Sequence, residues 1–198
     1  MEELNQSLFL LLNAPAHPGA FMLALGIFCA EYLIWAVPAV VAIGWLRGGK
    51  ETRRMMLEAT ASAVVALFVN QIIALLWQHP RPFVIGLGHN FVAHAPDSSF
   101  PSDHLTLLWS VASSLAMHRG RRATGVALAL LGLPVAWARI YVGVHYPLDM
   151  AGAVLVSAAS AWLVSCAACW WMPHTYWFAI RVHRTLFSKF IALGWVRR

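Results

Sequence analysis

The sequence is poor in charged residues and rich in apolar ones. Of its 198 residues only 11% are charged, whereas 60% are hydrophobic, and the mean hydropathy is +0.66. A soluble domain has about 25% charged residues, so a charged fraction this low argues against an ordinary soluble protein. We expect an all-α fold, a polytopic membrane helix bundle that forms one domain over residues 1–198.

Cysteines and clustered acids are scarce as well. The three cysteines are Cys29, Cys166 and Cys169. Cys166 and Cys169 have the spacing of a redox or zinc pair, but no second ligand pair accompanies them, and we predict that they pack in the core. No cluster of Asp and Glu suggests an obligatory two-metal site. We therefore expect neither a metal nor another cofactor.

Long apolar runs dominate what is present. They cover residues 20–46, 57–78, 104–117, 123–142 and 148–172. About 20 apolar residues cross a bilayer, and spanning segments must be helices because lipid offers their backbone no hydrogen bonds. We expect five spans, of which 104–117 is short. Residues 4–12 predict an interfacial helix or part of a hairpin, and the basic, aromatic tail 174–198 predicts an amphipathic surface helix on the cytoplasmic side.

The basic residues indicate the topology. Twelve of the fourteen Lys and Arg residues follow the first, third and fifth runs, so these regions should be cytoplasmic and the amino terminus outside. The start, Met1 to Glu3, lacks a basic n-region, and we expect the first span to be retained. Topology and anionic lipid explain the net charge of +6 without nucleic acid. Arg81 and Arg139 fall in two outward loops, which suggests a shared anionic ligand.

Arg81 lies between Pro80 and Pro82 after the second run. The prolines fix the backbone on both sides, and a guanidinium can hold phosphate oxygens bidentately. The alternative is an ordinary helix stop, which the prolines alone would give.

Ser102 and His104 stand at the start of the third run. Ser102 is a good N-cap, and the free amides beyond it make an anion site at the helix N-terminus. His104 would lie at the mouth of that site. Capping alone would explain Ser102, but it leaves His104 unexplained.

Arg139, His145 and Asp149 lie in the other outward loop. Pro147 suits the first turn of a helix, which places His145 just before that helix. Asp149 could orient His145, and a histidine can act as a nucleophile. Alone, this stretch is as consistent with a short polar loop that carries a snorkelling arginine as with a functional site. With His104 as proton donor and both arginines on the phosphate, the set favours phosphoryl transfer.

These motifs resemble the type-2 phosphatidic acid phosphatase superfamily. Five residues separate Arg139 from His145 and three separate His145 from Asp149, as in the third motif of that family. The resemblance covers residues 81–149 and implies a six-helix core, which five spans and the amino-terminal helix could supply. It implies His145 as nucleophile, His104 as general acid and Asp149 as the partner of His145. Arg81, Arg139 and the region of Ser102 would bind phosphate.

The chain departs from the family pattern at three positions. Ala74 stands where the first motif usually has lysine, Asp103 where the second usually has glycine, and Ala138 where the third usually has serine. We expect His79 to replace the missing cation. Asp103 would face Arg81 or Arg139, or position the hydrolytic water, and would be among the phosphate-binding residues.

The Pro-Ser-Asp-His form of the second motif resembles the bacitracin-resistance type of undecaprenyl-diphosphatase. The resemblance implies hydrolysis of undecaprenyl diphosphate at the outer face of a bacterial plasma membrane, which recycles the lipid carrier for peptidoglycan synthesis. A phosphatidate or phosphatidylglycerophosphate phosphatase, or a lipid phosphotransferase, would use the same site. A lipid-phosphate transporter would need the arginines but not a nucleophilic His145. The expected partners are a polyprenyl diphosphate and membrane lipids.

Two further features leave alternatives open. Glu31 is the only acid in the first apolar run. It could bind a motif arginine or Asn70 and Gln71 inside the bundle, or lie at the outer interface. Asp97, Ser98, Ser99, His89 and His94 share the outer loop with Arg81, and ordinary solvated positions are favoured for them over contacts with a distal phosphate.

Overall fold

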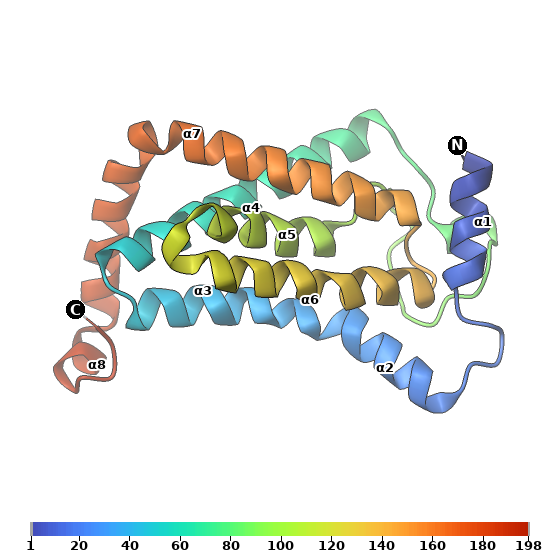
Figure 1. The fold of residues 1–198 in the computed structure, drawn as a ribbon, viewed down its shortest axis with the longest axis horizontal. Helices are drawn as coiled ribbons and strands as arrows, with labels where there is room; N and C mark the ends of the chain where they lie inside the picture. Colours follow the sequence, from blue (N-terminus) through green and yellow to red (C-terminus); the bar gives the residue numbers. More distant parts are fainter. Residues whose placement is uncertain (1, 198) are drawn as a thin grey trace.

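The chain folds as a bundle of helices, as Figure 1 shows. The computed structural model describes residues 2–197, and within them no β-strand occurs. The all-α prediction is confirmed. The α-helices are α1 Glu2–Leu12, α2 Ala20–Glu31, α3 Ala36–Arg47, α4 Lys50–Leu76, α5 Asp103–Met117, α6 Arg122–Tyr141, α7 Pro147–Leu186 and α8 Ser188–Ala192. Short 3-10 turns occupy Leu33–Trp35, Pro82–Ile85 and Arg119–Arg121.

Four segments are long and apolar enough to cross a membrane. They are Ala20–Arg47, Lys50–Leu76, Arg119–Tyr141 and Pro147–Leu186. The remaining expected span, α5, has 15 residues and is about 22 Å long at the usual helical rise. It packs against α4, α6 and α7, and its Leu105, Leu108 and Leu115 are fully buried. Because protein surrounds α5 on several sides, it needs less length than a helix that faces lipid.

The first span is interrupted close to its middle. Helix α2 ends at Glu31, the 3-10 turn Leu33–Trp35 follows, and α3 begins at Ala36. Pro38 lies in the first turn of α3, where proline is tolerated because the missing N–H would have no helical partner there. The interruption therefore falls at Glu31 and not at Pro38.

Helix α7 continues past the end that the sequence predicts. It runs without a break from Pro147 to Leu186 and contains Pro173, whereas a fifth run ending at residue 172 and a separate surface helix were expected. Figure 1 shows that α7 bends and that its second part crosses the end of the bundle beside α8. A proline inside a helix removes one hydrogen bond and bends the axis, so the basic tail changes direction without leaving the helix.

The prediction that Cys166 and Cys169 pack in the core is wrong. Cys29 is buried, but Cys166 and Cys169 are exposed on α7. The apolar run alone did not reveal which face of α7 meets the bundle. On the outer face of a spanning helix an apolar thiol meets lipid, which suits it as well as a protein core does.

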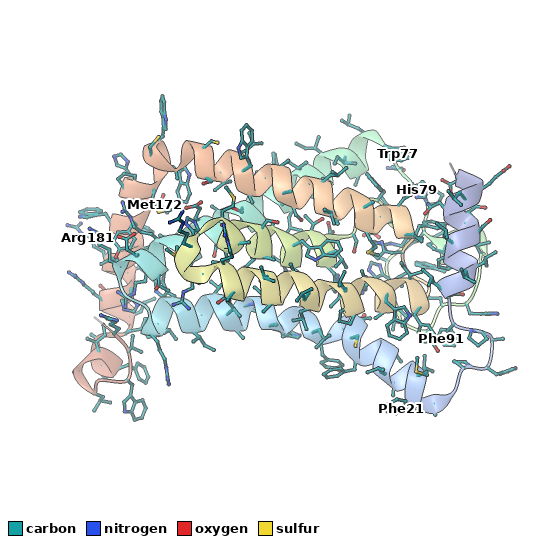
Figure 2. All side chains as sticks on the ribbon, in the orientation of Figure 1. Phe21, Trp77, His79, Phe91, Met172 and Arg181 are labelled. Carbon is teal, nitrogen blue, oxygen red and sulfur yellow. The ribbon has the colours of Figure 1, made fainter. Side chains whose placement is uncertain are left out.

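Helix α1 and the loops that carry the motifs gather at one end of the bundle, which we name the α1 end. Figure 2 shows Trp77, His79 and Phe91 at this end and Met172 and Arg181 at the opposite end. Side chains of α1 and of the residue that follows it tie the other elements together. Asn5 Oδ1 accepts from the Leu148 N–H at 3.1 Å, and Asn13 Nδ2 donates to the Tyr141 carbonyl at 3.0 Å.

Backbone hydrogen bonds also fix the two loops at the α1 end. The Ser99 N–H donates to the His79 carbonyl at 2.7 Å, so the loop returns to its own start. Gly143 turns the chain between α6 and α7 with φ of +89°, and a Cβ there would overlap the His89 carbonyl oxygen. Only glycine meets both requirements without strain. The turn brings His145 back over the end of α6.

Candidate active site

The amino-terminal turn of α7 holds His145 and Asp149 in contact. Pro147 occupies the first turn, as predicted, and the Asp149 side chain accepts from the Tyr146 N–H at 2.8 Å. The same oxygen, Oδ2, lies 3.1 Å from His145 Nδ1. Both side chains are buried, with 1% exposure for His145 and 0% for Asp149. The helix start thus fixes the carboxylate, and the carboxylate fixes the imidazole.

These contacts decide the tautomer of His145. A carboxylate only accepts hydrogen bonds, so Nδ1 carries the proton and Nε2 keeps its lone pair. Ser99 Oγ donates to the same Asp149 oxygen and lies 3.4 Å from His145 Nδ1. Three donors therefore converge on Asp149 Oδ2. The lone pair on Nε2 is the one that a nucleophile needs.

Arg81 contacts the reactive nitrogen of His145. Its Nη1 lies 3.1 Å from His145 Nε2 and donates to the Val144 carbonyl at 2.9 Å. Its Nε donates to Asp97 at 2.8 Å. Arg81 is 4% exposed, so its charge acts in a poorly solvated site. A group that binds at His145 Nε2 would meet this guanidinium.

The surroundings of His145 keep it neutral. Burial lowers the pKa of His145 well below its ordinary value, and the positive charges of Arg139 and Arg81 lower it further. A neutral imidazole is the nucleophilic form. Burial likewise lowers the pKa of His94, whose ring centroid lies 6.2 Å from that of His145.

Arg139 lies near both motif histidines. It is 1% exposed, and its charge acts more strongly than that of any other charged group on His104 and on His145. Its Nη1 donates to Glu31 Oε1 at 3.2 Å. Of the alternatives left open for Glu31, this contact supports binding to a motif arginine.

Ser102 begins α5, but its side chain does not cap it. The N-cap is Ser102, yet no side-chain capping bond forms, so that part of the prediction is wrong. Its Oγ is buried and has no hydrogen-bond partner within residues 2–197. The Asp149 carbonyl accepts from the Ser102 N–H at 3.3 Å. Since this bond and the backbone direction hold the residue in place, its hydroxyl remains available to an anion together with the free amides of α5.

His104 is half-buried in the first turn of α5. Besides Arg139, the charges of His94 and Arg81 act on it. The structure thus brings His104 to the same cluster as the two arginines and His145. The two histidines therefore come from two different helix starts.

Asp103 forms no ion pair with Arg81 or Arg139, so the pairing hypothesis is wrong, although its charge still acts on Arg139. Its exposed side chain accepts from Asn70 Nδ2 at 2.8 Å. The same amide nitrogen donates to Thr106 at 3.0 Å. Asn70 on α4 suits Asp103 because its amide donates a hydrogen bond to the carboxylate without bringing a charge of its own. The expectation that Asp103 binds phosphate or positions water remains a prediction.

His79 points toward α1. Its Nε2 lies 3.3 Å from Glu2 Oε2, and its ring packs edge-on against Tyr146. It nevertheless lines the same cavity of about 520 Å³ as Ala74, together with Asp97 and Ser98. His79 therefore neighbours the position where the family has lysine, and its role toward phosphate remains a prediction.

The loop before α5 contacts the site residues more closely than the sequence indicated. Ordinary solvated positions were favoured there, but Ser99 is fully buried against Asp149 and Asp97 binds Arg81. Neither contact had a signal in the sequence, because both depend on how the loop folds back. Within residues 2–197 no group of three or more His, Cys, Asp or Glu side chains could hold a metal ion.

Together, the cluster provides a nucleophile, a second histidine and a positively charged cradle. His145 offers a lone pair that Asp149 orients, Arg81 and Arg139 offer guanidiniums, and the α5 N-terminus offers amides. Such a set stabilises the equatorial oxygens of a phosphoryl group and the charge that develops on them.

Comparisons with known proteins agree with this geometry. The profile of the PAP2 superfamily matches residues 56–176. YbjG of Escherichia coli (strain K12), provisionally named an undecaprenyl-diphosphatase, is 38% identical over 202 aligned residues that cover 100% of this chain and 99% of that protein. Undecaprenyl-diphosphatase BcrC of Bacillus subtilis (strain 168) is 34% identical over 154 residues, 78% of this chain and 79% of that protein.

A solved structure shares the fold. The crystal structure of Aquifex aeolicus LpxE matches with a TM-score of 0.62 at 22% sequence identity, and the match covers 81% of this chain and 94% of that chain.

Proposed function

Since this chain belongs to the PAP2 superfamily, we propose that it hydrolyses undecaprenyl diphosphate to undecaprenyl phosphate and inorganic phosphate. Its relatives YbjG and BcrC carry that activity in their names. The observation that carries the proposal is the pair of contacts on His145, Nδ1 with Asp149 and Nε2 with Arg81. Such an imidazole can attack the electrophilic phosphorus of an anionic phosphoryl group.

In the first step, His145 Nε2 attacks the terminal phosphorus. The phosphate takes over the Arg81 Nη1 donor that Nε2 now holds, so the arginine is already in place when charge develops. The bond from phosphorus to the bridging oxygen breaks, and His104 supplies a proton to that oxygen. Undecaprenyl phosphate leaves, and the phosphoryl group remains on Nε2. Asp149 stabilises the positive charge that the ring acquires.

In the second step, water attacks the phosphohistidine. His104, now neutral, takes a proton from that water, and the bond between phosphorus and His145 Nε2 breaks. Inorganic phosphate leaves with both histidines back in their starting states. Arg81, Arg139 and the α5 amides hold the equatorial oxygens in both steps.

The orientation of the protein in the bilayer is consistent with this mechanism. The protein is a multi-pass membrane protein, and its motif residues gather at the α1 end. Basic residues concentrate toward the opposite end, which the positive-inside rule assigns to the cytoplasm. We infer that the α1 end faces outward from the bacterial plasma membrane, with the lipid tail in the bilayer and the diphosphate at the loops.

The deciding experiment measures phosphate release by purified protein in detergent. We expect release from undecaprenyl diphosphate to exceed release from phosphatidate and phosphatidylglycerophosphate, both with and without a chelator. Rapid acid quench should trap an acid-labile phosphoenzyme, and His145→Ala should form none. Full activity in His145→Ala would contradict the mechanism, and preference for phosphatidate would contradict the substrate.

A further inference from the structure

The carboxylate of Glu31 binds the most deeply buried guanidinium of the site. Glu31 Oε1 lies 3.2 Å from Arg139 Nη1. The arginine side chain is 1% exposed and that of Glu31 is 42% exposed. A buried donor left without an acceptor costs free energy, so the half-exposed Glu31 oxygen stabilises Arg139 from the edge of the site.

Close helix packing brings the two residues together. Glu31 is the last residue of α2, and Arg139 lies in the last turn of α6. Ala30 and Ala138 are fully buried in one cluster, and a Cβ on Gly26 would come within 2.8 Å of the Tyr141 ring. Small residues let helix backbones approach closely in membranes. The interruption of the first span directly after Glu31 then ends α2 at the level of Arg139.

Glu31 occupies only one side of the guanidinium. Nη1 donates to Glu31, whereas Nε and Nη2 are buried and have no partner within residues 2–197. Nε and Nη2 lie along one edge of the planar group, and parallel N–H bonds on such an edge match two oxygens of a phosphate. If Glu31 accepted from Nε or Nη2 instead of Nη1, its carboxylate would block this edge.

Arg81 shows what the blocked arrangement looks like. Asp97 accepts from Arg81 Nε at 2.8 Å, so the same edge of Arg81 is occupied. Asp97 is 62% exposed, and its loop position allows it to leave. The two arginines therefore differ, because Arg139 presents its bidentate edge already free.

We propose that Glu31 is a positioning residue that holds the Nε–Nη2 edge of Arg139 toward the phosphoryl group of the substrate. The proposal rests on the proposed function, since it assigns a phosphate to that edge. Glu31 acts through Arg139 and does not touch the reacting atoms. Its carboxylate oxygen, more than its charge, sets the orientation, so an amide of the same size should serve.

The test compares Glu31→Ala and Glu31→Gln with Arg139→Ala and with the double variant Glu31→Ala/Arg139→Ala. The matched control is Glu3→Ala, which removes an exposed acid of α1 at the same end. The probe is orthovanadate, titrated by calorimetry into each purified protein in detergent. Phosphate release from undecaprenyl diphosphate gives kcat and KM, and a melting curve shows that each variant folds.

We expect Glu31→Ala to weaken vanadate binding and to lower kcat/KM about 10-fold to 100-fold, the loss that a displacement of about 1 Å causes. Glu31→Gln should stay within about threefold of the parent protein because it keeps the acceptor oxygen and loses only charge. Adding Glu31→Ala to Arg139→Ala should change vanadate affinity less than about twofold, because residues that act through one another are not additive.

Three results would overturn the inference. The first is unchanged vanadate affinity in Glu31→Ala, and the second is an equal further loss when Glu31→Ala is added to Arg139→Ala. The third is a parent protein that fails to bind vanadate. If the parent binds vanadate but releases no phosphate from undecaprenyl diphosphate, the proposed substrate fails, and the titrations still decide the role of Glu31.

Discussion

Replacing Asp149 by asparagine separates two roles of the carboxylate, its charge and its hold on the tautomer of His145. Oδ2 accepts from the Tyr146 N–H and lies 3.1 Å from His145 Nδ1. A backbone donor requires an acceptor, so the asparagine oxygen should take the place of Oδ2. His145 then keeps its proton on Nδ1. Asp149→Asn should therefore remove the charge and leave the tautomer intact.

The size of the effect follows from the lost attraction. Once the phosphoryl group is on Nε2, the ring is positive, and opposite charges about 4 Å apart attract by about 4 kcal/mol at an effective dielectric constant of about 20. At 1.36 kcal/mol for each factor of ten, kcat should fall about 10³-fold. Ser99→Ala is the matched control. It removes one donor to the same oxygen, a loss of about 1 kcal/mol, so kcat should fall about fivefold.

The assay is single-turnover phosphate release with undecaprenyl diphosphate, together with nitrogen NMR of labelled histidines. The spectrum of Asp149→Asn should still show His145 protonated on Nδ1, assigned by comparison with His145→Gln. A kcat within tenfold of the parent would refute the argument from charge. A proton found on Nε2 would refute the argument from the Tyr146 backbone.

Three further predictions concern the same end of the molecule. Because the pKa of His145 is lowered, its imidazole should stay neutral below pH 6.5 in the NMR titration. The folded state then binds fewer protons than the unfolded one, so the free energy of unfolding should fall as pH drops through 6.5, and a titration of His145 at or above 6.5 would contradict this. Gly143→Ala should lower the melting temperature and the activity together, because φ is +89° there, and a parent-like melting curve would count against a strained turn. Asp97→Asn should change stability by less than about 1 kcal/mol, since Asp97 is 62% exposed and such pairs are weak. Denaturant unfolding checks this, and a larger loss would mean that the ion pair holds the loop.

Most residues of the candidate site could be identified from the order and spacing of the motifs. Arg81, His104, Arg139, His145 and Asp149 were identified from residue type and spacing, and the structure brings them together. The contact of Glu31 with Arg139 was one of several alternatives, because no pattern tells which way a lone acid in an apolar run points. Ser102 was assigned a cap that it does not make, because its hydroxyl forms no hydrogen bond to the first turn of α5.

The errors in the predicted fold had a common cause. Helix ends and exposed faces depend on neighbours that hydropathy does not record. The fifth run was expected to end at residue 172, yet α7 continues through Pro173 to Leu186. Cys166 and Cys169 were assigned to the core, yet they lie on the exposed face of α7. In a membrane both faces of a helix are apolar, so composition cannot separate the lipid side from the protein side.

The sequence by itself determined the class of the protein, the approximate positions of its long helices and the motif residues that meet at the candidate site. Apolar length, the bias of basic residues and motif spacing are all local properties, and they can be read along the chain. Only the tertiary structure decided which partner each charge finds. Glu31 meets Arg139 across α2 and α6, Asn70 meets Asp103 across α4 and α5, and Ser99 meets Asp149 where a loop folds back. Such pairs depend on how closely helices approach, and that distance is set by packing.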